Sequence, residues 1–431
     1  MIYSYNDNYF GGTLIKDTLS KLEHIEVSYG SPMYVMAKPV GAKCNLRCGY
    51  CYYLEKSELC DGISQLMSDD LLERYIKEYI EMQTTPEVLF IWHGGEPLLR
   101  PRSFYERAVE LQRRYADGRR VDNCIQTNAT LLDDEWSKFL GKHNFLVGVS
   151  IDGTREMHDA WRKNHNGESS FRDVVRGIRL LEKYRVEWNA MATVNAANAE
   201  HPLEFYRFFR DELGCRYLQF TPVVERVSMA SGTPRLMHAG ESGGELTPYS
   251  ITAAQWGGFL CAIFDEWVQN DVGEFFVQLF DTTLANWMGA PAGVCTMSKY
   301  CGHSAVVEHN GDVYSCDHFV FSEYRLGNLR DSSLMEMMYG TKQREFGAKK
   351  YTSLPHKCRG CRYEFACHGE CPRNRFIATE DGQAGLNYLC DGYYAFFEHA
   401  SEAMDYMRRQ LEQGLPPAGV MRWMAKRTNK R

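Results

Sequence analysis

The sequence lacks the features that would place this protein in a membrane or outside the cell. The longest apolar stretches, such as 145–151, are far shorter than the ~20 residues that a membrane span requires. The first residues have neither the basic start nor the apolar run of a secretory signal. The formal net charge of −7 argues against general affinity for nucleic acid or acidic membranes. We therefore expect a cytoplasmic protein with no nucleic-acid and no membrane partner.

Cysteine is too sparse for a disulfide scaffold, which typically exceeds about 8–10% cysteine in a short secreted chain. The chain has 15 cysteines in 431 residues, and an odd number without a secretory signal indicates reduced thiols. Eleven of them fall into three groups, at 44–51, 295–316 and 358–390. Of the other four, Cys124, Cys215 and Cys261 are predicted to be small core residues, and Cys60 has no assigned role. The grouped thiols predict metal or iron–sulfur ligation.

Strand-like and helix-like segments alternate between residues 33 and 225. The strand candidates are short and apolar, as expected when both faces of a sheet are covered, and they span 33–40, 88–92, 123–127, 146–151, 187–194 and 217–223. The intervening segments predict helices at 69–83, with Ser68 as N-cap, and at 104–115, 133–143, 171–185 and 202–213. Six such units favour an α/β fold with a parallel sheet, in the form of an open, partial (β/α)6 TIM-like barrel.

Composition changes along the chain predict five regions. They are an N-terminal extension, the partial barrel, a connecting helical region, a small Cys-rich domain, and a C-terminal helix with a basic tail, at 1–32, 33–245, 246–290, 291–395 and 396–431. Apolar residues recur at helical spacing over 256–267, which indicates a helix that faces the core, and a last helix is expected near 393–413. The Cys-rich region has few regular apolar faces, so hydrophobic burial alone does not stabilise it and it needs an additional element such as a bound metal.

The first cysteine group follows directly on the first predicted strand and consists of Cys44, Cys48 and Cys51. Three thiolates at C-x3-C-x2-C spacing fit a 4Fe–4S cluster with one iron left open, and the alternatives are an incomplete zinc site or chance. Chance is a poor explanation, because α/β sites are built at the C-terminal ends of strands. The second strand runs into His93-Gly94-Gly95-Glu96, where the glycines let the backbone approach a ligand and Glu96 could receive an ammonium group. Taken alone, this second pattern is merely a turn.

The aromatic residue before the last cysteine, in Tyr50-Cys51, makes this motif resemble the signature of the radical S-adenosylmethionine superfamily. In that family S-adenosylmethionine chelates the open iron, and an electron from the cluster yields a 5′-deoxyadenosyl radical that abstracts a hydrogen atom. The resemblance implies that the cofactor is bound by Tyr50, Gly94, Gly95, Glu96, Ser150, Arg162 and Val223. Ser150 and Arg162 would hold the methionyl carboxylate, although each could instead be an N-cap or a surface ion pair. His93 is either a core histidine or a substrate contact.

The later cysteines form the patterns Cys295-x5-Cys301-x14-Cys316 and Cys358-x2-Cys361-x5-Cys367-x3-Cys371, followed by Cys390. By spacing alone, eight thiols make two four-thiolate sites for either zinc or iron–sulfur clusters. The second pattern resembles the SPASM extension of peptide-modifying radical enzymes. That resemblance implies two auxiliary 4Fe–4S clusters, one held by Cys295, Cys301, Cys316 and Cys371, the other by Cys358, Cys361, Cys367 and Cys390. Full ligation leaves no open iron, which suggests electron relay.

Asp317 directly follows Cys316, and spacing alone would favour a solvated loop residue. In anaerobic sulfatase-maturating enzymes, an aspartate directly after this cysteine is the general base. The Cys316-Asp317 pair therefore makes the chain resemble this family within the radical enzymes. The resemblance covers roughly residues 33–395. The resemblance implies oxidation of a Cys or Ser in an unfolded or nascent sulfatase to Cα-formylglycine. The cofactors would be S-adenosylmethionine and three 4Fe–4S clusters, and an external electron donor such as flavodoxin or ferredoxin would serve them.

Two alternatives stay open at this point. Another SPASM enzyme could form thioether or carbon–carbon crosslinks in a precursor peptide, although only about 30 residues precede the first strand, too few for the recognition domain that such enzymes often carry. A non-catalytic zinc or iron–sulfur scaffold is the alternative from a different class. Serine and cysteine are equal candidates for the target residue.

Overall fold

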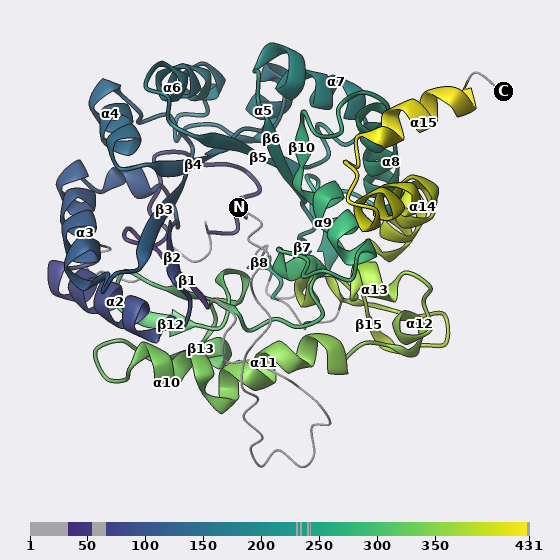
Figure 1. Ribbon diagram of the computed structural model, residues 1–431. Coiled ribbons are helices and arrows are strands. Elements are labelled where there is room, and N and C mark those ends of the chain that lie inside the picture. The colour runs from purple at the N-terminus through teal and green to yellow at the C-terminus, as the bar shows by residue number, and fades with distance from the viewer. Residues whose placement is uncertain are drawn as a thin grey trace.

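A curved sheet lines the inside of this computed structural model, and helices cover its outer face as a ring (Figure 1). The structure describes residues 33–53, 66–229, 232, 235–238, 241 and 243–428. Six parallel strands follow one another in chain order: β1 (Tyr34–Ala37), β2 (Glu87–Trp92), β3 (Arg120–Thr127), β4 (Phe145–Ser150), β5 (Trp188–Val194) and β6 (Tyr217–Pro222). The predicted partial barrel is confirmed.

The helices of the ring lie where the sequence predicts them, with one addition. The predicted set is α2 (Asp69–Met82), α3 (Arg102–Tyr115), α4 (Asp134–Lys142), α6 (Phe171–Lys183) and α7 (Pro202–Arg207), the last continued by a π-helical turn, η2 (Phe208–Glu212). Ser68 caps α2 as predicted, because its side chain accepts a hydrogen bond from the Leu71 amide at 3.3 Å. The addition is α5 (Arg155–Trp161), a short helix in the loop after β4.

The sheet does not stop at the ends of the barrel. On one side β10 (Phe276–Val277) pairs with β6, and on the other β11 (Ser304–Val307) pairs with β1 in parallel, with Val307 opposite Ala37. The antiparallel strands β12 (Asp312–Tyr314) and β13 (Arg325–Asn328) complete ten strands in the order β10-β6-β5-β4-β3-β2-β1-β11-β12-β13. One hydrogen-bonded sheet therefore joins the barrel to the Cys-rich region.

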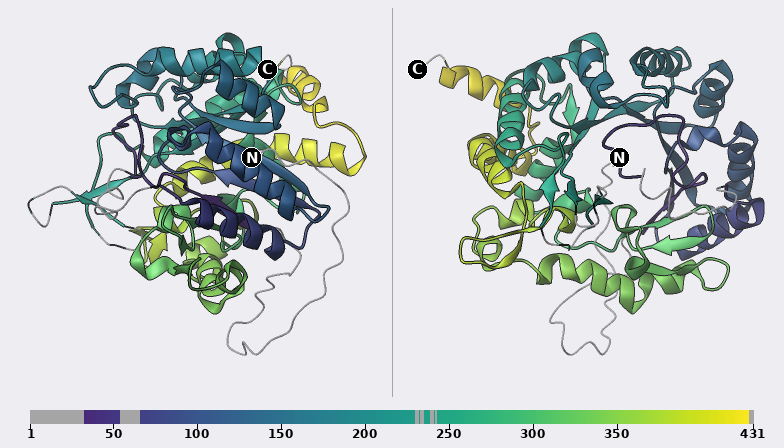
Figure 2. Two further views of the ribbon diagram at one scale, coloured as in Figure 1. Left: turned by 90° about the vertical axis from the view of Figure 1, so that its left-hand side faces the viewer. Right: turned by 180° about the vertical axis from the view of Figure 1, so that it is seen from behind.

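Two long helices pack side by side next to the barrel, α8 (Ala253–Asn270) and α14 (Cys390–Glu412) (Figure 1). They approach closely at a glycine, since a Cβ atom on Gly392 would lie 2.2 Å from the Ala253 carbonyl oxygen. The C-terminal helix α15 (Gly419–Thr428) projects from the rim of the ring, as the view from behind also shows (Figure 2). Within the described residues, no helix is long and apolar enough to cross a bilayer.

The remaining elements are short and lie mostly in the Cys-rich region. Its helices are α10 (Leu334–Tyr339), α11 (Thr341–Thr352), α12 (His356–Arg359) and α13 (Glu364–Cys367), and α9 (Gln278–Trp287) leads into it. The 3₁₀ turns are η1 (Pro97–Leu99), η3 (Cys295–Met297), η4 (Asp317–Phe319), η5 (Ser322–Tyr324) and η6 (Pro372–Asn374). Two small sheets contain β7 (Arg226–Ser228), β8 (Arg235–Leu236) and β9 (Glu245–Leu246), and β14 (Ile377–Ala378) with β15 (Ala384–Leu386).

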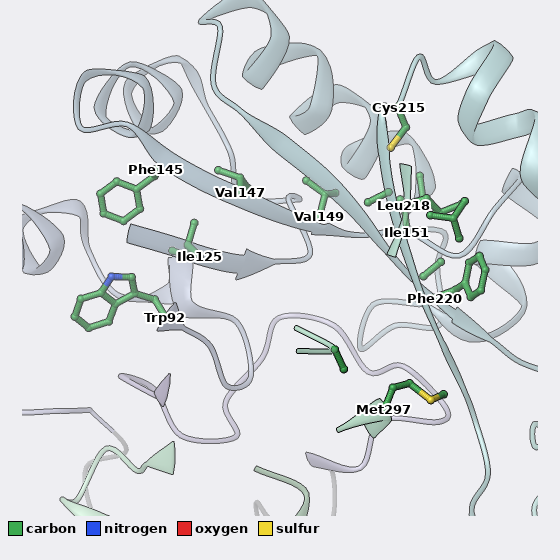
Figure 3. Packing of buried hydrophobic residues seen from close by; sticks show 14 of the residues in the cluster. Trp92, Ile125, Phe145, Val147, Val149, Ile151, Cys215, Leu218, Phe220 and Met297 are labelled. Carbon is green, nitrogen blue, oxygen red and sulfur yellow. The ribbon is translucent and has the colours of Figure 1, made fainter. Parts of the chain in front are cut away.

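The main hydrophobic core lies between the sheet and the helices around it. Figure 3 shows Ile125, Val147 and Val149 on neighbouring strands pointing toward these helices, and all three are fully buried. Cys215 is buried here as predicted, whereas Cys124 and Cys261 are only half-buried, so the core assignment fails in part for those two. Cys60 lies outside the described residues.

Candidate functional site

The loop that follows β1 carries the first cysteine group, and the turn after β2 packs directly against it. The amide of Gly95 donates to the Gly41 carbonyl at 2.8 Å, and the amide of Glu96 donates to the Lys43 carbonyl at 2.8 Å. A Cβ atom on Gly95 would lie 2.1 Å from the Lys43 carbonyl oxygen, so only glycine fits this contact. Gly94 adopts a φ of +111°, which also favours glycine. The two glycines therefore bring this turn to the cysteine loop.

Glu96 joins the ends of β2 and β3. Its buried carboxylate accepts hydrogen bonds from the Leu98 amide at 2.9 Å, the Thr127 hydroxyl at 2.8 Å and the Asn128 amide at 2.8 Å. Burial raises the pKa of Glu96 to about 7, although these hydrogen bonds act in the opposite direction. Asn128 also directs its side-chain nitrogen at the Cys44 sulfur, 3.7 Å away. The Glu96 carboxylate thus already has three protein donors and helps to shape the rim of the cysteine loop.

Three polar side chains meet on the barrel side of the cysteine loop, and we call Tyr50, Asp152 and Arg162 the barrel triad. The Tyr50 hydroxyl donates to Asp152 and accepts a 2.8 Å hydrogen bond from Arg162 Nη1. Arg162 Nη1 lies 3.8 Å from Asp152, and all three side chains are buried. Among the described residues, Arg162 Nε is buried without a hydrogen-bond partner. An unsatisfied guanidinium nitrogen at this place fits a ligand that brings a carboxylate.

The other predicted cofactor contacts lie at the ends of their strands. Ser150, at the end of β4, accepts a hydrogen bond from the Gln126 side chain at 2.9 Å. Val223, just after β6, packs with Cys48 and Tyr50, and its amide and carbonyl are both hydrogen-bonded within the protein, to Val194 and Ile251. The resemblance implies that the backbone near Val223 meets the adenine of the cofactor, and this contact stays a prediction.

A second polar group surrounds Asp317, and we call Asp317, Lys38, Tyr52 and Tyr53 the base site. Asp317 Oδ1 lies 2.6 Å from the Lys38 ammonium, while Oδ2 accepts hydrogen bonds from Tyr52 and, at 2.7 Å, from Tyr53. The Asp317 side chain is 11% exposed, so it is not the solvated loop residue that its spacing alone favoured. Burial raises the pKa of Tyr52 and Tyr53 well above the usual value, and the charge of Asp317 raises it more. Both hydroxyl groups therefore stay protonated and act as donors.

Two histidines border the base site. His93 Nδ1 accepts a hydrogen bond from the Gly94 amide at 2.8 Å and lies 3.2 Å from the Tyr53 hydroxyl. His318 packs against the Tyr52 ring and lies 3.0 Å from Arg373 Nη1. Arg373, two residues after Cys371, also pairs with Glu225 at the end of the barrel. The base site is therefore built from the barrel and the Cys-rich region together.

Burial raises the pKa of several of the later cysteines. For Cys371 the charge of Glu370 and then the charges of other thiols add to burial, and for Cys316 the charges of Cys295 and Asp317 do so. Burial and then the charges of other thiols raise the pKa of Cys367 to about 12 and that of Cys390 to about 11. The division of these cysteines into two ligand sets stays a prediction.

The fourteen cysteines in the described part of the chain are all free thiols. Buried thiols with raised pKa values need a cationic group to hold them as thiolates. By their chemistry these thiols suit either zinc or an iron–sulfur cluster.

Sequence reasoning missed four residues of this region: Lys38, Tyr52, Tyr53 and Glu308. Glu308 contacts the Lys38 ammonium at 2.8 Å across 270 residues of sequence. The two tyrosines directly follow Cys51, and this position was a usable signal, because a residue next to a cluster ligand must lie near the site. Lys38 and Glu308 belong to no motif, and only the pairing of β1 with β11 brings them together.

The chain is similar to known proteins along most of its length. The chain matches the models of the Radical SAM superfamily at residues 39–209 and of the SPASM iron–sulfur cluster-binding domain at 295–362. It is 58% identical to the Serine-type anaerobic sulfatase-maturating enzyme of Bacteroides thetaiotaomicron over 91% of this chain and 95% of that protein. It is 33% identical to the Cysteine-type anaerobic sulfatase-maturating enzyme of Clostridium perfringens over 86% of this chain and 96% of that protein.

A solved structure, native anSMEcpe with bound AdoMet and Cp18Cys peptide, has a TM-score of 0.78 to this chain at 31% identity, covering 88% of this chain and 100% of that one. Streptococcus suis SuiB bound to S-adenosylmethionine matches with a TM-score of 0.57 at 15% identity and covers 86% of this chain and 80% of its own, which shows a shared fold. S-adenosylmethionine and 4Fe–4S clusters are accordingly the cofactors of this enzyme. The chain belongs to the anaerobic sulfatase-maturating enzymes, a radical SAM family with a SPASM domain.

Proposed function

We propose that this enzyme oxidises a serine, in preference to a cysteine, in an unfolded or nascent sulfatase polypeptide to Cα-formylglycine. The observation that carries the choice of serine is the 58% identity to a Serine-type enzyme over 91% of the chain, against 33% to a Cysteine-type enzyme over 86%. The reaction removes one hydrogen atom from the serine Cβ, one proton from its hydroxyl group and one further electron.

Asp317 is the proposed general base of this reaction. When bound, S-adenosylmethionine and the clusters supply the hydrogen-atom acceptor and the path for the electron. Asp317 takes the hydroxyl proton, because it is a carboxylate with an 11% exposed side chain that faces a domain junction rather than bulk solvent. Tyr52 and Tyr53 orient the carboxylate by donating to Oδ2. His93, within 3.2 Å of Tyr53, is the proposed contact for the substrate.

The first cysteine group and the barrel triad form the proposed cofactor site. Cys44, Cys48 and Cys51 bind the cluster, and the Gly94-Gly95 turn, which packs on their loop, meets the cofactor amino group. Arg162 binds the methionyl carboxylate, supported by its unsatisfied buried Nε. The remaining proposed contacts are Tyr50, Glu96, Ser150 and Val223. Each of these contacts is a proposal, and titration of single-residue variants with S-adenosylmethionine can test it.

The two later thiol sets are the proposed auxiliary cluster sites, with Cys295, Cys301, Cys316 and Cys371 in one and Cys358, Cys361, Cys367 and Cys390 in the other. Three 4Fe–4S clusters predict about twelve irons per chain. Cys371→Ala and Cys361→Ala should each lower the iron content by about four per chain, since each removes a ligand from a different set. Cys215→Ala, at a buried cysteine outside the sets, is the matched control and should leave iron unchanged. Zinc without sulfide in the purified protein would refute the assignment.

We also propose a cytoplasmic location and an external one-electron carrier such as flavodoxin or ferredoxin. The proposed domain boundaries are those expected from composition, with the extension at 1–32, the barrel at 33–245, the connecting region at 246–290, the SPASM domain at 291–395 and the C-terminal part at 396–431. The barrel and the proposed SPASM domain share one sheet, because β11 pairs with β1.

Substrate choice is tested by anaerobic turnover of two peptides that differ only in Ser or Cys at the target position. Mass spectrometry should detect formylglycine, and the kcat/KM for the serine peptide should exceed that for the cysteine peptide. A higher kcat/KM for the cysteine peptide would overturn the serine assignment. Formation of 5′-deoxyadenosine without formylglycine from either peptide would overturn the proposed function as a whole.

A further inference from the structure

Lys38 occupies a position between two carboxylates that belong to a distant part of the chain. Its ammonium nitrogen lies 2.8 Å from Glu308 Oε1 and 2.6 Å from Asp317 Oδ1, and it lies 4.6 Å from the centre of the Tyr53 ring. The side chain is 1% exposed. Burial disfavours the ammonium, yet the two carboxylates more than offset this, so the pKa of Lys38 lies well above its usual value. Lys38 is therefore a buried ammonium group held between two carboxylates.

The rest of Lys38 belongs to the barrel side of the site. Its amide donates to the Val307 carbonyl at 2.9 Å, and its carbonyl accepts a hydrogen bond from the Gly41 amide at 3.2 Å, at the start of the cysteine loop. A Cβ atom on Gly94 would lie 3.1 Å from both Cβ and Cγ of Lys38, so the lysine stem packs under the glycine turn. One residue thus contacts the cysteine loop, the glycine turn and the carboxylate of Asp317.

Glu308 fixes the other side of the lysine. It lies in the turn between β11 and β12, where its amide donates to the Asp312 carbonyl at 2.8 Å. Its side chain is 11% exposed. Burial alone would raise the pKa of Glu308, but Lys38 outweighs it and the pKa ends below its usual value, so the pair is ionic. Without Glu308, the lysine would have Asp317 as its single carboxylate partner among the described residues.

We propose that Lys38, anchored by Glu308, is a positioning residue that fixes the carboxylate of Asp317 relative to the radical-generating site. This inference rests on the proposed role of Asp317 as the general base. Hydrogen-atom removal and proton removal act on adjacent atoms of one substrate side chain, so their two centres must keep a fixed separation. Lys38 is the link between these centres, because its stem packs against the glycine turn and its charge binds Asp317. Loss of the link uncouples the two removals.

The direct test is Lys38→Met, which removes the ammonium and keeps most of the stem. Formylglycine formation should fall at least about tenfold, while cleavage of S-adenosylmethionine in the presence of peptide continues, so the ratio of 5′-deoxyadenosine to formylglycine rises about tenfold. Iron content and peptide affinity should stay unchanged. Lys38→Arg should recover part of the coupling. Lys77→Met, at an exposed lysine on α2, is the matched control and should leave the ratio unchanged.

A double-mutant cycle separates a positioning role of Lys38 from a general loss of structure in the variant. Because Lys38 acts through Asp317, Lys38→Met combined with Asp317→Asn should form no less product than Asp317→Asn alone. Further loss in the double variant, or an equal fall of both products in Lys38→Met, would overturn the proposal. If Lys38→Met does not fold, Glu308→Gln provides the same readout with a smaller rise of the ratio, about threefold, and an unchanged ratio there would also overturn it. If Asp317→Asn keeps full product formation, the general-base assignment itself fails.

Discussion

The barrel triad and the base site each combine tyrosine, aspartate and a basic residue, and both take their tyrosines from one short segment, Tyr50 to Tyr53. In the barrel triad, Asp152 has no exposed surface, and Thr193 donates to it twice, from its amide and its hydroxyl, at 2.9 Å each. In the base site, Asp317 keeps an 11% exposed side chain. In both groups an aspartate accepts a hydrogen bond from a tyrosine and lies beside a basic residue, but of the two aspartates it is Asp317 that keeps exposed surface for a substrate to reach.

The two groups also differ in what they connect. All members of the barrel triad belong to the barrel and its cysteine loop, whereas the base site joins Lys38, Tyr52 and Tyr53 of the barrel to Asp317 of the SPASM domain. Changes in the barrel triad should therefore impair cofactor cleavage and product formation together. Changes in the base site should impair product formation alone.

The largest expected effect follows from Asp317→Asn. The amide cannot take the hydroxyl proton, so formylglycine formation should fall by about 10²–10⁴-fold, while 5′-deoxyadenosine continues to form. Both products are measured by mass spectrometry in one anaerobic reaction. A parallel loss of both would show that Asp317 is structural, and the distinction between the two groups would disappear.

Asp152→Asn should produce the next largest effect, on stability. The substitution leaves the buried guanidinium of Arg162 without a counter-charge, and breaking a buried pair costs about 3–5 kcal/mol. We expect a lower thermal midpoint and a parallel fall of cofactor cleavage and product. Asp211→Asn, at a half-exposed ion pair with Arg210, is the control and should change stability by less than about 1 kcal/mol. Selective loss of product in Asp152→Asn would contradict the comparison.

Gly95→Ala tests the glycine turn between the two groups. The added Cβ would meet the Lys43 carbonyl at 2.1 Å, and such overpacking typically costs about 1–3 kcal/mol. Because the turn would move away from the cysteine loop, affinity for S-adenosylmethionine should fall, as measured by ligand titration. Gly258→Ala, on α8 with no atom within 4 Å of the new Cβ, should not weaken binding. Unchanged cofactor affinity in Gly95→Ala would show that the turn does not form the binding surface.

The smallest effects should come from removing single hydroxyl groups, at about 1–2 kcal/mol each, in the free energy of unfolding for Tyr50→Phe and in the barrier to product formation for Tyr52→Phe. Tyr50→Phe should lower the thermal midpoint without changing the ratio of 5′-deoxyadenosine to formylglycine. Tyr52→Phe should raise that ratio by several fold with little change in stability, because it removes a donor to Asp317. Thermal unfolding and product ratios measured on both variants make a matched pair. If both variants behave alike, the two tyrosines do not serve different groups.

Features encoded in short stretches of sequence were predicted well. Helix α2 was expected at 69–83 and spans Asp69–Met82, because the cap at Ser68 and the helical periodicity are local signals. The family was predicted from the resemblance of the cysteine motifs and of the Cys316-Asp317 pair to known enzymes, and these motifs are readable because cluster ligands on one loop are close in sequence. Helix α5 was not predicted, because it is short and its side chains carry little periodicity.

Contacts set by the order of strands were not predicted. The cysteine-rich part was expected as a separate region, and nothing in the sequence indicates that β11 pairs with β1. That pairing brings Glu308 and Asp317 to Lys38, so the base site could be predicted only as a single residue beside a cysteine. Likewise, Arg162 was expected as a cofactor contact, but its hydrogen bond to Tyr50 depends on how the loop after β4 folds back.

The position of β1 also constrains how the chain is made. β1 lies between β2 and β11, so one edge of it stays unpaired until residues beyond 304 have left the ribosome. An unpaired strand edge attracts other chains, and contacts of such long sequence separation form slowly. The nascent chain must therefore keep its cysteine loop next to an open edge through most of synthesis. Closure of the sheet at β1 therefore waits for the Cys-rich region.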